Sequence, residues 1–386
     1  MSFPLICALC AFTVTLYAAF ELILGLKKMA VLADTGPCPG GGNPRVSVIV
    51  PACNEEDNIE QGLLSLLSQQ YENLEVIVVN DRSTDSTADI LLRLQKSYPQ
   101  LVVYTVTDLP DGWMGKSHAL TLGASYATGE YLLFTDADCM LEKTTISRAI
   151  HFLKNRHADH LTLIFQNCSH NWLLDCLISD TGAGLLLMFK PWKVREKGNR
   201  FFIGVGAFNL LKNSVYKAVG GHEKIKMHPI DDMMLARTIK KHGFHQECLL
   251  AGDYVKVPWY DSVTAMVSGL MKNMFAVVHY RLSAIPFLLA GVTIVSVFPL
   301  WGIFFAAGYV RFFCLAAFLI KTLLVWGGMR YQGLPSWYVV GSLFTPYITL
   351  YIIVRAAVTT LVRGGIEWRG TVYSLEEMKK SEPFLF

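Results

Sequence analysis

Residues 45–81 read RVSVIVPACNEEDNIEQGLLSLLSQQYENLEVIVVND, and this stretch decides the fold class. Val46-Ser-Val-Ile-Val50 is a β-branched run typical of a buried strand, and Leu74-Glu-Val-Ile-Val-Val79 is a second one. The residues between them, from Asn54 to about Gln69, have the pattern of a helix. A strand, a helix and a strand in this order predict a parallel pair joined by a crossover helix.

The alternation continues along the chain. Helices are expected over 83–96 and 116–127, and strands over 101–106 and 131–134. We therefore predict an α/β fold, a doubly wound and mostly parallel sheet flanked by transmembrane helices. Such sheets bind ligands beyond the carboxyl ends of their strands. Polar residues that directly follow a strand are therefore the first candidates for a functional site.

The composition indicates membrane segments. The 386 residues are 52% hydrophobic and only 17% charged, against about 25% charged in an average soluble protein. Apolar stretches lie at 2–26, 284–307, 312–326 and 337–358. Lys27 and Lys28 follow the first stretch, which predicts that the next domain faces the cytosol. The third stretch is short and carries Lys321, and the tail is basic, so two or three C-terminal spans are expected.

Two further segments have a mixed character. Apolar residues recur at three- and four-residue steps over 266–282, interrupted by Lys272 and Arg281. This pattern predicts a helix in the membrane interface or a core helix of the soluble domain. Trp172 to Trp192 is a second interfacial candidate. The expected organisation is a transmembrane helix (1–28), a linker (29–44), a catalytic domain (45–258), an interfacial region (259–283), transmembrane segments (284–360) and a polar tail (361–386).

Charge and cysteine content exclude some functions. A net charge of +3 and the lack of any run of five basic residues argue against nucleic-acid binding. The nine cysteines have no regular spacing, which predicts reduced thiols and no zinc site.

Two carboxylates follow the last predicted strand. Asp136 and Asp138 stand two residues apart after Tyr131-Leu-Leu-Phe134, and in an extended chain they would share one face. Such a pair can hold Mg²⁺ or Mn²⁺, with diphosphate oxygens as the other ligands. The metal would neutralise the charge of a departing nucleoside diphosphate. Solvated loop acids are the alternative interpretation.

Asp81 stands at the end of a predicted strand and Lys116 at the start of a predicted helix. Asp81 ends the second strand, where it can accept hydrogen bonds from a nucleobase or ribose, with a helix N-cap as the alternative. Lys116 opens a helix, where its charge and the backbone N–H groups favour an anion. It is not part of a P-loop, because Pro110 stands where that motif needs glycine.

Asp231 and Asp232 form an acidic pair before a helix expected over 233–241. Adjacent carboxylates repel each other, so one of them can have a raised pKa and act as a base. Acids in the first turn of a helix are also favoured by its dipole. Spacing alone favours this second, structural interpretation.

Together these motifs resemble the inverting family 2 glycosyltransferases of GT-A fold. The resemblance covers about residues 46–253, roughly half of the chain. It rests on VIVPACNEE (48–56), VVNDRSTDST (78–87), GKSHAL (115–120), TGEYLLFTDAD (128–138), GVGAF (204–208), Gly220-Gly221 and Asp231-Asp232.

The resemblance implies a role for each matching residue. Asp232 stands at the position of the family's catalytic base, with Asp231 in place of the usual glutamate beside it. Asp136 and Asp138 would contact the donor and a Mg²⁺ or Mn²⁺ ion. The expected donor-binding residues are Pro51, Ala52, Asn54, Glu55, Asp81, Lys116, Asp136 and Gly206.

Within this family, the chain is similar to hopanoid-associated, carotenoid-type and ceramide-type lipid glycosyltransferases. The similarity lies in the membrane layout, in Trp113-Met-Gly-Lys116 and in the tail Ile366-Glu-Trp-Arg-Gly-Thr-Val-Tyr373. The expected activity is transfer of one sugar from a UDP-sugar to a lipid at the cytosolic face of the cell membrane. The Q/R-x-x-R-W motif of processive synthases and ceramide glucosyltransferases is missing, since no Arg-Trp occurs in the sequence. The alternatives are a polyprenyl-phosphate or polysaccharide-chain acceptor, nucleotidyl or phosphoryl transfer, and non-catalytic nucleotide-sugar binding.

Overall fold

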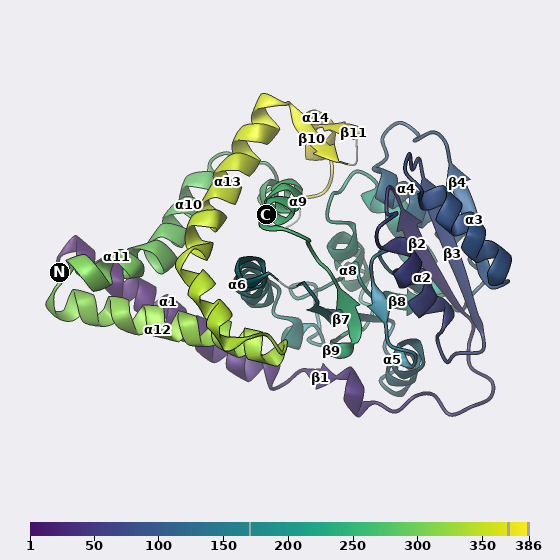
Figure 1. The fold of residues 1–386 in the computed structure, drawn as a ribbon, viewed down its shortest axis with the longest axis horizontal. Coiled ribbons are helices and arrows are strands. Elements are labelled where there is room, and N and C mark those ends of the chain that lie inside the picture. Colours follow the sequence, from purple (N-terminus) through teal and green to yellow (C-terminus); the bar gives the residue numbers. More distant parts are fainter. Residues whose placement is uncertain (170, 369–370, 384–386) are drawn as a thin grey trace.

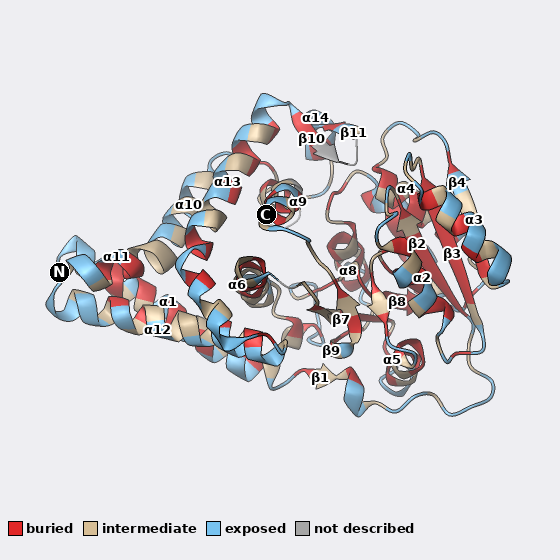
Figure 2. Cartoon of the chain, viewed as in Figure 1, coloured by how far each residue is buried: buried red, intermediate tan, exposed pale blue. Residues whose placement is uncertain are grey.

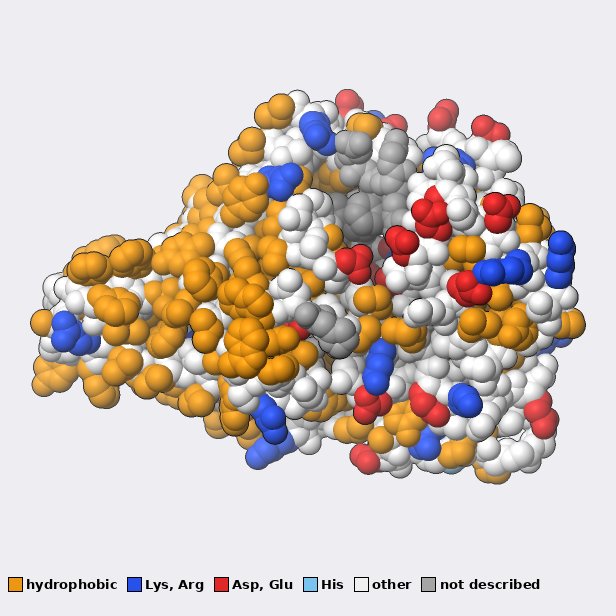
Figure 3. All heavy atoms as spheres, viewed as in Figure 1, with side chains coloured by type: hydrophobic (Ala, Val, Ile, Leu, Met, Phe, Trp, Pro, Cys, Tyr) orange, Lys and Arg blue, Asp and Glu red, His pale blue; other side chains and the backbone are white. Residues whose placement is uncertain are grey.

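The computed structural model describes residues 1–169, 171–368 and 371–383 and has two parts (Figure 1). A sheet with helices on both faces lies at the right of the view, and long helices extend to the left. Hydrophobic side chains cover most of the visible surface of these helices, whereas charged side chains gather over the sheet part (Figure 3). The structure thus has a helical part with an apolar surface and a sheet part with a more charged surface.

The sheet has nine strands in the order β1-β9-β7-β8-β5-β2-β3-β4, with β6 paired to β9. β8 is antiparallel to both of its neighbours, and the strands on its two sides run parallel to one another. This confirms the predicted mostly parallel sheet, with a reversed strand near its centre. The strands are β1 (Ala30–Val31), β2 (Val46–Ala52), β3 (Leu74–Asp81), β4 (Leu101–Val106), β5 (Tyr131–Phe134), β6 (Met140–Leu141), β7 (His160–Asn167), β8 (Asn209–Lys212) and β9 (Gln246–Val257).

Helices cover both faces of the sheet, so the doubly wound architecture is also confirmed. One core contains Val48 and Val50 of β2, and a second core contains Ile49, because side chains alternate along a strand. Figure 2 shows the strands buried between the two helix layers. The first core includes α2 (Ile59–Leu67), α3 (Thr87–Ser97) and α5 (Thr145–Asn155), and the second includes α4 (Gly115–Tyr126), α7 (Asn213–Val219) and α8 (Asp231–Lys241).

The helices after β2 and β3 begin later than predicted. The expected starts are Asn54 and Ser83, whereas α2 begins at Ile59 and α3 at Thr87. The two preceding loops bind each other instead, since Asn54 Oδ1 accepts a hydrogen bond from the Thr84 N–H (2.8 Å). Asn54 also has a left-handed backbone with φ 54°, which is incompatible with a right-handed helix.

Within the described part of the chain, five helical stretches are long and apolar enough to cross a membrane. The segment expected at 312–326 is longer than predicted, and the one expected at 337–358 is divided into a 3-10 helix (Ser336–Leu343) and an α-helix. The stretches are α1 (Phe3–Leu26), α6 (Trp172–Phe189) with the residues to Lys193, α10 (Ala284–Val292) with α11 (Phe298–Phe305), α12 (Gly308–Tyr331) and α13 (Thr345–Val362).

These helices do not all run in one direction. α1, α11 and α12 pack on one another, and α1 and α12 lie along the horizontal axis of Figure 1. α6 and α9 (Val263–Val277) are viewed nearly end-on, so they run across that direction. α13 packs on α9 and α10. The side chain of Lys272, one of the predicted interruptions of the apolar pattern, lies outside the described residues.

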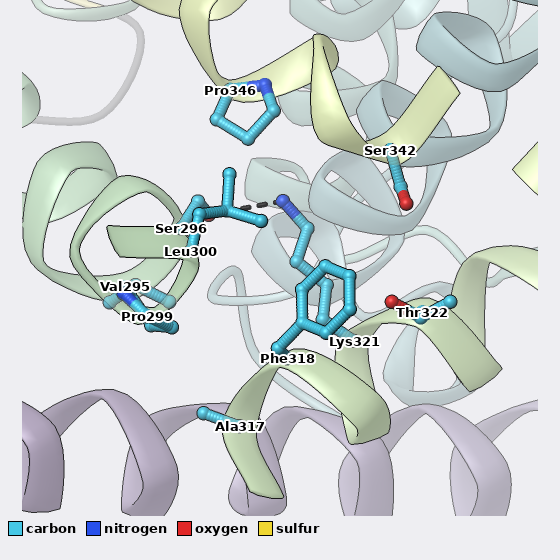
Figure 4. A pocket seen from close by; sticks show the side chains of 10 residues that line it. All are labelled: Val295, Ser296, Pro299, Leu300, Ala317, Phe318, Lys321, Thr322, Ser342 and Pro346. Atoms are coloured by element: carbon cyan, nitrogen blue, oxygen red, sulfur yellow. Dashed lines mark hydrogen bonds between the residues drawn. The ribbon is translucent and has the colours of Figure 1, made fainter. Parts of the chain in front are cut away.

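A polar cluster joins the apolar helices. Lys321 Nζ of α12 donates to Ser296 Oγ (3.0 Å), as Figure 4 shows. The same Nζ lies 3.1 Å from Asp180 Oδ2 of α6. Thr345 Oγ1 of α13 donates to the same carboxylate oxygen (2.8 Å). The charge that interrupts the third apolar segment is therefore paired, as required in a low-dielectric setting.

The predicted linker (29–44) and the predicted polar tail (361–386) both contain secondary structure. Ala30 and Val31, in the predicted linker, form β1 at the edge of the sheet beside β9. The tail forms a hairpin of β10 (Gly365–Trp368) and β11 (Thr371–Ser374), followed by α14 (Leu375–Lys379). Arg369, Gly370 and residues 384–386 of the predicted tail lie outside the described residues.

Candidate functional site

The ends of β3 and β5 and the start of β8 meet at one edge of the sheet. Phe134 of β5 pairs with Asn209 of β8, which places the segment before β8 beside the residues after β5. The Asp136 N–H accordingly donates to the carbonyl oxygen of Gly206 (3.2 Å). The structure therefore brings together Asp136 and Gly206, which come from separate sequence motifs.

Lys116, in the first turn of α4, connects the two acidic pairs. Its Nζ is 2.7 Å from Asp136 Oδ1 and 3.6 Å from Asp231 Oδ2. Burial alone would lower the pKa of Lys116, but the charges of Asp136, Asp231 and Asp232 outweigh this effect and raise the pKa well above its usual value. A pocket here is lined by Lys116, Leu120, Phe134, Thr135, Asp136, Gly206, Asn209, His222, Asp231 and Asp232.

Asp232, in the first turn of α8, is oriented by two backbone N–H groups. Its Oδ2 accepts from Gly206 (2.9 Å) and its Oδ1 accepts from Met233 (2.7 Å). Burial and the adjacent charge of Asp231 raise the pKa of Asp232 to about 6. Asp232 is thus a fixed carboxylate with a pKa close to neutral, which suits a general base. Asp231 is buried and faces Lys116 instead.

Asp138 lies in a turn and not in an extended chain. β5 ends at Phe134, and the Cys139 N–H bonds to the Asp136 carbonyl oxygen (3.4 Å). The expectation that Asp136 and Asp138 share one face of an extended strand is therefore wrong. Burial, together with the charges of Asp136 and Glu55, raises the pKa of Asp138 to about 7.

The carboxylates around Asp138 fit a divalent cation. Asp136, Asp138 and Glu55 interact as like charges, and a cation would relieve their repulsion. Carboxylate oxygens are the ligands preferred by Mg²⁺ and Mn²⁺. Across residues 1–169, 171–368 and 371–383, no group of three His, Cys, Asp or Glu side chains is arranged to hold an ion. A cation held by Asp136 and Asp138 would need its remaining ligands from outside the chain, such as diphosphate oxygens and water.

The loop after β2 lies beside the end of β3. Pro51 and Ala52 pair with Val79 and Asn80, directly before Asp81. The Glu55 N–H donates to Thr87 Oγ1 (2.9 Å), which fixes the loop against α3. The proposed donor ligands Pro51, Ala52 and Glu55 are thus placed at this edge. Asn54 is exposed, and its amide oxygen bonds to the neighbouring loop.

Asp81 is buried and forms a two-point ion pair with Arg82. Arg82 Nε lies 2.8 Å from Oδ1, and Nη2 lies 2.9 Å from Oδ2. Gly115 approaches so closely that a Cβ there would lie 2.3 Å from Asp81 Oδ2. The alternative role of Asp81 as a helix cap is not observed, because Asp85 Oδ1 accepts from the Thr87 N–H at the start of α3 (3.0 Å).

Arg82 and His222 also lie at this site, although the sequence analysis assigned no role to either; Arg82 is part of the motif at 78–87. Arg82 has a left-handed backbone, φ 56°, in which a residue other than glycine is uncommon. His222 lines the pocket, and its Nδ1 is 2.9 Å from the Tyr216 hydroxyl. Burial lowers the pKa of His222 to about 4, so its ring is neutral. Gly220-Gly221, directly before His222, is the only signal in the sequence that the backbone is unusual near this histidine.

The chain is similar in sequence to known glycosyltransferases. The family described as Glycosyl transferase family 2 matches residues 47–220. A 4,4'-diaponeurosporenoate glycosyltransferase of Staphylococcus haemolyticus is 29% identical over 239 residues, covering 59% of this chain and 60% of the relative. A probable glycosyltransferase of Bacillus subtilis, YdaM, is 37% identical over 114 residues, 29% of this chain and 27% of the relative. The chain thus matches no more than 60% of the length of these two relatives.

A solved structure shares the fold. The mannosyltransferase PcManGT of Pyrobaculum calidifontis, in complex with GDP-Man and Mn²⁺, has a TM-score of 0.56 and 20% sequence identity, over 93% of this chain and 99% of that chain. At this identity the likeness concerns the fold alone. Residues 47–220 therefore form a glycosyltransferase family 2 domain, and the sheet part of the chain has the GT-A fold.

Proposed function

We propose that the protein is a membrane-bound, inverting glycosyltransferase that moves one sugar from a nucleotide sugar to a lipid acceptor. The observation that carries the proposal is the placement of Asp232. Two backbone N–H groups orient its carboxylate within the pocket that also contains Lys116 and Asp136. A base beside donor-binding groups suits a single displacement, and the family 2 domain supports this reaction class.

In the proposed reaction, an acceptor hydroxyl attacks the anomeric carbon from the face opposite the diphosphate. The new C–O bond forms as the bond to the diphosphate oxygen breaks, and Asp232 takes the proton of the acceptor. One displacement inverts the anomeric configuration, so an α-linked donor gives a β-linked product. Lys116 stays charged between Asp136 and Asp231 and stabilises the negative charge of the leaving diphosphate.

We propose a UDP-sugar as the donor, with Asp81 as a ligand of the nucleobase or ribose. Mg²⁺ or Mn²⁺, held by Asp136 and Asp138, would supply positive charge to the departing diphosphate. PcManGT is described in complex with GDP-Man and Mn²⁺, which supports a divalent ion and makes GDP-sugars the first alternative donors to test.

The lipid acceptor is supported by the apolar helices and by the relatives named 4,4'-diaponeurosporenoate glycosyltransferases. α9 packs on α6 and α13 and runs across the direction of α1 and α12. This is the orientation expected of a helix that lies in the membrane interface. We propose that an acceptor reaches Asp232 along this helix without leaving the bilayer.

We further propose three membrane crossings, by α1, α10–α11 and α12. α6 is flanked by β7 and β8, which pair in one sheet, so its two ends are on the same side. The tail contacts the catalytic domain, where Lys241 pairs with Glu382, so these parts also share a side. An even number of crossings must therefore connect them, and α13, which packs on α9, is the helix that does not cross. Lys27 and Lys28 then favour a cytosolic catalytic domain.

The test is an assay of membranes that contain the wild-type protein or Asp232→Asn with a panel of labelled UDP- and GDP-sugars. We expect a labelled lipid of inverted configuration, identified by mass spectrometry, only with the wild type. Transfer of a labelled phosphate in place of the sugar would identify a phosphoryl or nucleotidyl transferase. Label in a polyprenyl phosphate or a polysaccharide would replace the proposed acceptor.

A further inference from the structure

The C-terminal hairpin reaches back to the proposed donor site. The Tyr373 hydroxyl accepts a hydrogen bond from the Gly115 N–H (3.1 Å), although these residues are 258 positions apart. Thr371 Oγ1 accepts one from Arg82 Nη1 (3.2 Å), across 289 positions. Thr371 and Tyr373 are alternate residues of β11 and therefore share a face, whereas Val372 between them is exposed.

Arg82 and Gly115, the two residues that bond to the hairpin, flank the carboxylate of Asp81. Arg82 bonds to each of its oxygens, and Gly115 packs against Oδ2 without room for a Cβ. An ionised carboxylate has about four lone-pair sites, so the two bonds from Arg82 leave capacity to accept from a nucleotide. The positions of Arg82 and Gly115 determine the direction in which that remaining capacity is presented.

The hairpin is fixed in place by a hydrophobic core. Ile366 and Tyr373 are buried together with Met114 of the loop before α4, Phe275 of α9 and Met378 of α14. This core joins the catalytic domain, the helix proposed to lie in the membrane interface and the tail. The Tyr373 hydroxyl is thus held at a defined point, which a loosely attached tail could not achieve.

We propose that Tyr373 and Thr371 are positioning residues of the donor-nucleotide subsite and act on Asp81 through Gly115 and Arg82. The inference rests on the proposed function, because it assigns the nucleotide to Asp81. Loss of either hydrogen bond from the hairpin weakens nucleotide binding by about three- to tenfold. The chemical step, which depends on Asp232, is not affected.

The test compares Tyr373→Phe and Thr371→Val with the matched control Val372→Thr in the full-length protein. The first two substitutions remove an acceptor oxygen and keep the shape of the side chain. We measure dissociation constants for UDP and GDP in the presence of Mn²⁺, and the donor KM and kcat. We expect the constants and the donor KM to rise about three- to tenfold for Tyr373→Phe and Thr371→Val, with kcat within about twofold of the wild type. Val372→Thr should bind as the wild type does.

If the wild type binds a nucleotide and both hairpin variants bind it equally well, the inference is overturned and the proposed function stands. A lower Tm with unchanged dissociation constants would also overturn it, because the hairpin would then be only structural. If the wild type binds neither nucleotide and transfers no sugar, the proposed function fails and the inference fails with it.

Discussion

The backbone N–H of Gly206 donates a 2.9 Å hydrogen bond to Oδ2 of Asp232. The carbonyl oxygen of the same glycine accepts the Asp136 N–H at 3.2 Å. Gly206 therefore links the carboxylate proposed as the base to the one proposed to bind the donor. The reversed direction of β8 makes this link available, because it places the residues before β8 at the carboxyl ends of the parallel strands.

Gly206→Ala should impair catalysis and leave the fold intact. A Cβ at this position would lie 2.6 Å from Asp136 Oδ2 and 3.4 Å from Lys116 Nζ. Both atoms end flexible side chains, so they can move aside, and the donor site is distorted. We expect kcat/KM to fall about 10- to 100-fold, with little change in Tm. Gly204→Ala is the contrasting variant, because its Cβ would lie 2.0 Å from the backbone oxygen of Asp232 and must displace α8. Wild-type kcat/KM in Gly206→Ala would contradict the proposed geometry.

Asp232→Asn should remove the base and preserve donor binding. The amide keeps an acceptor oxygen for one backbone N–H but cannot take the acceptor proton. We expect kcat to fall by about 10² or more, with the dissociation constant for the donor nucleotide unchanged. Asp231→Asn should cost less, since Asp231 contacts Lys116, whereas the carboxylate oriented by Gly206 and Met233 is that of Asp232. An inactive Asp231→Asn beside a nearly normal Asp232→Asn would reverse the assignment.

The activity should depend on pH through Asp232. Burial and Asp231 raise its pKa to about 6, and only the deprotonated carboxylate can act as a base. At saturating donor, kcat should therefore be constant above this pH and should fall about tenfold per pH unit well below it. A kcat that is flat from pH 5 to pH 8 would show that Asp232 is not the base. Asp231→Asn should move the midpoint of the profile to lower pH, because it removes a neighbouring negative charge.

The sequence predicts the parts of this protein that depend on local pattern. The strands at 101–106 and 131–134 have the predicted bounds, because their hydrophobic runs end at polar residues. The predicted placement of Asp81 at the end of a strand and of Asp136 shortly after one is likewise observed. In each case the signal lies within a few residues of the feature, so no knowledge of the tertiary structure is needed.

The contacts that complete the site could not be predicted in this way. Lys116 meets Asp231 across a large sequence separation, and Arg82 meets Thr371 across 289 positions. No periodicity or spacing in the sequence encodes such pairs. The start of α2 was also misplaced, because Asn54 bonds to Thr84 of another loop and takes a left-handed backbone. Tertiary contacts here outweigh the local preference for a helix.

Activity should require a divalent ion held by Asp136 and Asp138. Asp138→Asn keeps the shape of the side chain but replaces an anionic ligand with a neutral one, so turnover should be lost. Chelation with EDTA should also abolish activity, and added Mn²⁺ or Mg²⁺ should restore it in the wild type only. Asp89→Asn, which makes the same change at an exposed position of α3, is the matched control. Full activity in excess EDTA would refute the metal requirement.

Membrane topology can be measured with single cysteines and an impermeant maleimide. Three crossings place the N-terminus outside and both the catalytic domain and the tail inside. Ser2→Cys should therefore be modified in intact cells, whereas Glu377→Cys in the tail and Glu72→Cys in the catalytic domain should be modified only after permeabilisation. All three positions are exposed in the structure, so a failure to react reports the side of the membrane and not burial. The native protein gives the background from its own cysteines, of which Cys10 lies exposed on α1. Modification of Glu377→Cys but not of Glu72→Cys in intact cells would mean that α13 crosses the bilayer. The contact of the tail with Lys241 would then be impossible.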